Sequence, residues 1–111
     1  METNCIFCKI ADGEIPTDFV YENDTIAAFR DINPTAPEHI LVIPKKHIEN
    51  LNELNDREIM ADLLFGVKEV CKKLNITDYR TVINTGKGAG QEVFHIHFHI
   101  IAGRPLKWPP G

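Results

Sequence analysis

The sequence has no long apolar run, no internal repeat and no excess of basic residues. A membrane-spanning helix needs about 20 consecutive apolar residues, so we expect no membrane partner. The formal net charge of −4 argues against a nucleic-acid partner, because binding to a phosphate backbone rests on a basic surface. The N-terminus has neither the basic nor the apolar segment of a secretory signal, and we therefore expect a cytoplasmic protein.

Cysteine is scarce, with three residues in the chain. An odd number does not suit a framework of disulfide bonds, and a chain of 111 residues can fold without one. Cys71 falls within an apolar helical pattern and is expected in the core. Cys5 and Cys8 form a C-x-x-C motif, which is either half of a metal site or a redox pair.

The length predicts a single domain over residues 1–111, and hydrophobic periodicity indicates its elements. One long amphipathic helix begins at Asn55, a favourable N-cap that Glu58 follows three residues later, and it ends near Asn75. This helix is expected to act as scaffold. The other predicted elements are a short helix over residues 5–12 and strands over residues 19–21, 25–30, 40–43, 81–84 and 94–102.

His95, His97 and His99 occupy every second position of the last predicted strand. Side chains two residues apart on a strand share a face, so the imidazoles line one surface while Ile96, Phe98 and Ile100 enter the core. Positions four apart are separated by about 13 Å, so a single zinc ion with bonds of about 2.0–2.1 Å would hardly reach all three rings. The row suits bases, nucleophiles or ligands, and the alternative is a solvated face without a role.

Three glycines alternate with other residues in the segment 85–91, just before this strand. They indicate a backbone that is tightly curved or closely approached. A histidine after a glycine-rich turn suits phosphoryl or nucleotidyl transfer, because neutral imidazole is a good nucleophile near pH 7 and phosphate oxygens need donors around them. A plain hairpin turn would give the same glycine pattern.

The residues Phe94–Ile101 resemble the His-φ-His-φ-His-φ-φ signature of the histidine triad (HIT) superfamily, where φ is an apolar residue. Other segments are similar to the Hint branch of that superfamily, namely residues 5–10, 29–32, 37–47, 90–94 and 108–111. The resemblance implies an α+β fold with a five-stranded antiparallel sheet and two helices. It also implies a homodimer with a ten-stranded sheet, in which the tail 105–111 reaches the partner.

The same resemblance implies a purine nucleoside phosphoramidase, which hydrolyses the P–N bond of AMP or GMP amines. His97 would attack phosphorus and form a nucleotidyl-histidine intermediate, and His99 would bind the phosphate and assist proton transfer. A backbone carbonyl that accepts the Nδ1–H of His97 would leave its Nε2 free to attack. His95 and His39 would complete the catalytic cluster, although a structural hydrogen bond is the alternative for His39.

The nucleotide contacts implied by the resemblance cover base, ribose and phosphate. An apolar slot would sandwich the purine, although its residues could equally be ordinary core: Ile6, Phe7, Ile10 and Phe29. Asp31 would accept bonds from the ribose hydroxyls with Ile32 beside it, and Trp108 would reach the partner's site and shape the choice of leaving group. The phosphate would lie against Asn84, Gly90, Gln91, Glu92 and Val93.

Glu92 departs from the animal Hint pattern, which has a serine at this position. A carboxylate beside an anionic phosphate would repel it, so we expect Glu92 to turn away or to bind the leaving amine.

Zinc-carrying relatives imply a structural zinc site formed by Cys5, Cys8, His47 and His95. Four protein ligands would complete a tetrahedron, and the chemistry itself would need no cofactor. The alternative is a reduced cysteine pair packed near the base pocket.

Two other functions stay open at this point. One is dinucleoside polyphosphate hydrolysis or nucleotidylyl transfer, and the other is a nucleotide-binding scaffold with incidental catalysis.

Overall fold

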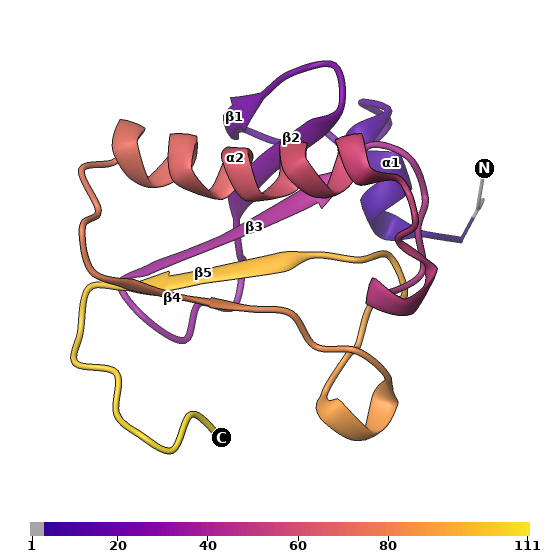
Figure 1. Cartoon of the computed structure of the whole chain (residues 1–111). Coiled ribbons are helices and arrows are strands. Elements are labelled where there is room, and N and C mark those ends of the chain that lie inside the picture. The colour runs from indigo at the N-terminus through magenta and orange to yellow at the C-terminus, as the bar shows by residue number, and fades with distance from the viewer. Residues whose placement is uncertain (1–3) are drawn as a thin grey trace.

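A computed structural model describes residues 4–111, in which five strands form one antiparallel sheet (Figure 1). The sheet order is β1-β2-β3-β5-β4, and every neighbouring pair is antiparallel. The strands are β1 (Phe19–Glu22), β2 (Ile26–Arg30), β3 (Glu38–Pro44), β4 (Tyr79–Val82) and β5 (Phe98–Ala102). The helices are α1 (Ile6–Ala11) and α2 (Arg57–Lys73), with 3-10 turns η1 (Leu51–Glu53) and η2 (Lys87–Ala89). The predicted fold class, a five-stranded antiparallel sheet with two helices, is confirmed.

The two faces of the sheet carry separate apolar clusters. Alternating residues of β2 and β3 explain this, because Ile40 and Val42 belong to the cluster with α2 while Leu41 and Ile43 belong to the cluster with α1. Strand β3 is therefore apolar on both faces, as its continuous apolar run predicts. The helix α2 lies along one face of the sheet (Figure 1). The opposite face, which packs against the short helix α1, is therefore the face where we look for a functional site.

The helix α2 starts at a different cap from the predicted one. Asp56 is the N-cap, and its carboxylate accepts hydrogen bonds from the backbone N–H groups of Glu58 and Ile59. The prediction of Asn55 was wrong by one residue, because the Asn55 side chain donates to the carbonyl of Glu53 instead. Both residue types are good caps, and only the path of the chain decides between them.

Strand β5 begins at Phe98, four residues later than predicted, because imidazole rings take the carbonyls that a longer ladder would use. His95 Nε2 donates to the carbonyl of Pro44 at 2.7 Å, and His97 Nδ1 donates to the carbonyl of His95 at 2.8 Å. Pro44 also has no N–H to offer to a partner strand. The alternation still holds, since Ile96, Phe98 and Ile100 are buried against α2.

Strand β4 also differs from its prediction, since it covers residues 79–82 and not 81–84. The remaining strands and the short helix agree with their predicted positions within two residues, and the largest difference among them is at β3, which begins at Glu38 and not at residue 40. Within residues 4–111, no helix combines the length and the apolar character needed to span a bilayer.

Candidate active site and metal-binding cluster

A cavity of about 990 Å³ opens on the face of the sheet that packs against α1. It collects thirteen of the residues predicted to bind nucleotide or to act in catalysis: Ile6, Phe7, Ile10, Phe29, Asp31, Ile32, His39, Asn84, Gly90, Glu92, Val93, His97 and His99. They come from α1, β2, β3, β5 and the loops beside them. A second cavity of about 810 Å³ lies between β4 and the segment 102–106 and is lined by none of the predicted site residues.

His97 sits in the cavity wall with its side chain oriented by the backbone. Its Nδ1 donates to the carbonyl of His95 at 2.8 Å, so in the neutral ring the lone pair is on Nε2. Burial lowers the pKa of His97, and the His95 carbonyl and the Asp31 carboxylate oppose this shift only in part. The ring is thus held as a neutral base or nucleophile, with only 8% of its surface exposed.

His39 and His99 form a hydrogen-bonded pair beside His97. The backbone N–H of Thr35 donates to His39 Nδ1 at 3.1 Å, so the proton of neutral His39 is on Nε2. That nitrogen lies 2.9 Å from His99 Nδ1 and donates to it. His99 therefore carries its own proton on Nε2, which is buried and has no hydrogen-bond partner among the described residues.

The electrostatic environment keeps His99 neutral. Burial, followed by the neighbouring imidazoles of His97 and His39, lowers the pKa of His99 to about 4. The rings of His97 and His99 lie 4.9 Å apart between centroids, so one reacting group can contact both. His97 thus offers a lone pair and His99 an N–H donor at neighbouring positions. Nucleophilic attack coupled to proton transfer requires these two groups.

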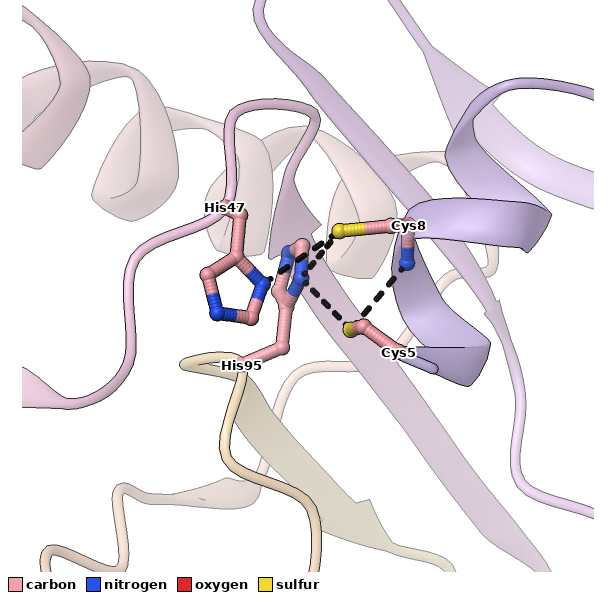
Figure 2. A group of neighbouring side chains, drawn as sticks. All are labelled: Cys5, Cys8, His47 and His95. Atoms are coloured by element: carbon pink, nitrogen blue, oxygen red, sulfur yellow. Dashed lines mark hydrogen bonds between the residues drawn. The ribbon is translucent and has the colours of Figure 1, made fainter. Parts of the chain in front are cut away.

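A second cluster joins Cys5 and Cys8 to His47 and His95 (Figure 2). Cys5 Sγ lies 3.3 Å from His95 Nδ1, and Cys8 Sγ lies 3.3 Å from His47 Nδ1. All four ligand atoms fall within 4.8 Å of one another. Ligand atoms around a tetrahedral zinc ion are separated by about 3.5 Å, given bonds of about 2.3 Å to sulfur and 2.0–2.1 Å to nitrogen. The cluster therefore fits such an ion.

The orientation of His95 also fits metal binding. Its Nε2–H is donated to the carbonyl of Pro44, which leaves the Nδ1 lone pair directed at the two sulfur atoms (Figure 2). A carbonyl at the outer nitrogen is the usual support for a metal-bound histidine. Burial lowers the pKa of His95 to about 4, so its ring is neutral and able to coordinate. His95 does not line the cavity and reaches His97 through its backbone carbonyl.

Two predicted nucleotide contacts lie outside the cavity. The Gln91 side chain accepts from the N–H of Gly86 and donates to the carbonyls of Glu49 and Val93, so it braces the glycine-rich loop. The Trp108 side chain is 82% exposed on the C-terminal segment.

Sequence reasoning missed several residues that shape the cavity. Thr35 orients His39 through its backbone N–H, which leaves no side-chain signal to read. The segment 15–20, Arg30, Asn33 and Leu41 also line the cavity. Only the strand pattern around Phe19 marked any part of that segment.

The comparison with known proteins agrees with this geometry. A family model described as the HIT domain matches residues 12–106 of the chain. The chain belongs to the HIT family.

Relatives of this HIT protein cover nearly its whole length. It is 50% identical over 114 aligned positions to an uncharacterized HIT-like protein of Synechococcus elongatus, with 100% of both chains covered. It is 48% identical to a 14 kDa zinc-binding protein of Zea mays, over 96% of this chain and 87% of the relative. The crystal structure of a HIT family hydrolase from Legionella pneumophila matches with a TM-score of 0.92 at 50% identity, covering 97% of this chain and 100% of that one.

Proposed function

We propose that this protein is a purine nucleoside phosphoramidase of the Hint branch, which works through a covalent nucleotidyl intermediate on His97. One observation carries the proposal. The His95 carbonyl fixes the proton on Nδ1 of a buried, neutral imidazole that lines the cavity, and Nε2 is left to attack phosphorus. The similarity to a HIT family hydrolase from Legionella pneumophila supports a hydrolytic outcome.

The first step breaks the P–N bond. The lone pair on His97 Nε2 attacks phosphorus while the leaving nitrogen takes the proton from His99 Nε2, which a proton from solvent in the cavity replaces, so the products are a nucleotidyl-histidine and a neutral amine. In the second step water attacks the same phosphorus and releases a proton to solvent, the bond from phosphorus to His97 Nε2 breaks, and AMP or GMP leaves. Such transfer of a positioned proton contributes typically 10²–10⁴-fold to the rate.

The nucleotide lies along the apolar part of the cavity in this proposal. Phe7 and Phe29 pack edge to face with ring centroids 5.6 Å apart, and Ile6 and Ile10 continue the same wall. This surface suits a purine ring without selecting its polar edge. One Asp31 oxygen accepts the backbone N–H of Asn33, which fixes the carboxylate where it can accept the ribose hydroxyls.

Donors for the phosphate come from the loop before β5. Asn84, Gly90 and Val93 line the cavity there, and Gly90 adopts a left-handed conformation with φ of 94°. Gln91 holds this loop from inside, so its proposed part in phosphate binding is to fix the backbone.

The Cys5, Cys8, His47 and His95 cluster is proposed to bind zinc. With four protein ligands the metal would be structural, and it would tie the N-terminal segment to the residues that precede β5. The 48% identity to a protein named for zinc binding in Zea mays supports this assignment. Bound there, zinc would supply no step of the reaction, and it would hold the His95 carbonyl in place for His97.

A homodimer is also proposed, with one domain over residues 1–111 in each copy. Leu64 and Phe65 of α2 expose 57% and 60% of their surfaces, and β4 is an edge strand of the sheet formed by the described residues. Pairing two β4 edges would give a ten-stranded sheet and cover these side chains. The tail 105–111, with exposed Trp108, would then extend toward the partner.

A fluorogenic adenosine phosphoramidate tests the proposed activity. The wild type should release AMP, the His97→Ala variant should not, and diadenosine polyphosphates should be poor substrates. Equal AMP binding by both proteins with no turnover by either would favour the nucleotide-binding scaffold. Faster cleavage of diadenosine polyphosphates would favour the polyphosphate hydrolase.

A further inference from the structure

The cavity around His97 is more acidic than a phosphate site is expected to be. Its lining includes three carboxylates, from Asp18, Asp31 and Glu92. The only lysine or arginine among the described lining residues is Arg30, and its guanidinium is paired with Glu38 at 2.8 Å. An anionic substrate thus enters a cavity whose cation is already engaged and whose carboxylates repel it.

Two nitrogen atoms mark where the reacting group is held. The His97 side chain is buried, with 8% of its surface exposed. Its Nδ1 donates a hydrogen bond to the carbonyl of His95, and its Nε2 has no hydrogen-bond partner within the described residues. The Nε2 of His99 is buried beside it and also lacks a partner within residues 4–111. These unpartnered atoms point to a ligand that accepts and donates at the same place, between the apolar slot and the loop before β5.

Glu92 lies on that loop and is not among the residues assigned to base and ribose. The Gln91 amide fixes the backbone on both sides of it, through the N–H of Gly86 and the carbonyl of Val93. The Glu92 side chain is exposed at the cavity lining, and no hydrogen bond or ion pair joins it to another described residue. Asp31, by contrast, is held by Asn33 and lies 3.5 Å from the His39 ring.

We propose that Glu92 selects leaving groups that carry a positive charge, so that the substrates are phosphoramidates of diamines or of other amines with a second cationic group. This inference rests on the proposed phosphoramidase function. The ammonium group would offset the negative charge of the cavity and pair with a carboxylate that has no partner within residues 4–111. Because Glu92 is exposed, a single ion pair there is expected to change kcat/KM by about fivefold at low ionic strength.

Three adenosine phosphoramidates of matched length test the proposal. The amines are 1,5-diaminopentane, n-hexylamine and 6-aminohexanoate, whose chain ends are an ammonium, a methyl group and a carboxylate. The wild type should cleave the ammonium compound about fivefold faster than the neutral one, and the carboxylate compound more slowly still. Glu92→Gln should make the three rates nearly equal, and added salt should shrink the differences in the wild type.

Asp18→Asn is the matched control, because it removes a carboxylate from the lining of the same cavity, on the segment directly before β1. Its preference among the three compounds should stay close to that of the wild type. Equal wild-type rates, a preference that survives Glu92→Gln, or an equal loss in Asp18→Asn would each overturn the role of Glu92.

Binding of the same compounds to His97→Ala, measured by calorimetry, separates the two proposals. If the wild type cleaves none of the compounds, the phosphoramidase function fails. The order of the dissociation constants in His97→Ala and in His97→Ala with Glu92→Gln then still decides whether Glu92 selects charge.

Discussion

The hydrogen bond from His39 to His99 should control catalysis without touching the substrate's phosphorus. His39→Leu removes the donor that lies 2.9 Å from His99 Nδ1. His99 can then carry its proton on either nitrogen, and the proton needed at Nε2 is present only part of the time. A hydrogen bond of this kind contributes about 0.5–1.5 kcal/mol net, and 1.4 kcal/mol is tenfold in a rate. We expect kcat/KM for an adenosine phosphoramidate to fall by about twofold to tenfold.

His39→Gln provides the matched control, because its amide N–H₂ can still donate to His99. This variant should recover most of the lost rate. A ¹⁵N spectrum of the imidazoles should show the Nε2–H form of His99 in the wild type and a mixture of both forms in His39→Leu.

The stability of both variants must be measured by urea unfolding. The leucine variant leaves a buried acceptor without its donor, which costs about 1–3 kcal/mol of unfolding free energy. A folded His39→Leu with wild-type kcat/KM and an unchanged His99 tautomer would refute the reasoning.

Three further predictions concern the metal cluster, the helix surface and pH. Purified protein should contain about one equivalent of zinc per chain by elemental analysis, and Cys8→Ser should lose it and melt at a lower temperature; less than about a tenth of an equivalent in the wild type would reject the site. Phe65→Glu, at an exposed site of α2, should shift the mass in solution from dimer to monomer in light scattering, whereas Glu69→Gln on the same helix should not. Because the folded pKa of His99 is about 4, below its unfolded value of 6.5, this residue's contribution to stability is complete above pH 6.5 and is lost as pH falls toward 4. The melting temperature of the wild type should therefore fall between pH 6.5 and pH 4, and that of His99→Asn should fall less over the same range. A melting temperature that rises as pH falls would contradict this.

Periodicity located the strands and the faces of their side chains, and the resemblance to the HIT superfamily implied the five-stranded antiparallel sheet that they form. The continuous apolar run in β3 predicted a strand buried on both sides, and the alternation of Ile96, Phe98 and Ile100 predicted which histidines share the opposite face. These features follow from burial, which is encoded in residue type.

The ends of elements could not be predicted in the same way. Both Asn55 and Asp56 are suitable caps, and the carboxylate of Asp56 is the one that reaches the first N–H groups of α2. The start of β5 depends on side-chain rings that replace backbone partners at Pro44 and His95. Hydrogen bonds between segments that are distant in the sequence determine where these elements begin and end. A local residue pattern therefore cannot predict these boundaries.

The candidate site was predictable where residue type carries the chemistry. The histidines and the Cys5 and Cys8 pair could be read from the sequence, and the fold brings them into two adjacent clusters. The role of Thr35 could not be read, because it acts through a backbone N–H. Gln91 was predicted to contact the phosphate of the nucleotide. In the structure its side-chain amide forms hydrogen bonds with Gly86 and Glu49 that hold the glycine-rich loop.

Trapping of the covalent intermediate tests the central claim most directly. The wild type is mixed with an adenosine phosphoramidate, quenched rapidly at alkaline pH where phosphohistidine bonds survive, and digested for mass spectrometry. The account predicts one adenylyl group on the imidazole of His97 and none in His97→Ala. Turnover with no trapped adduct, or an adduct on another residue, would contradict it.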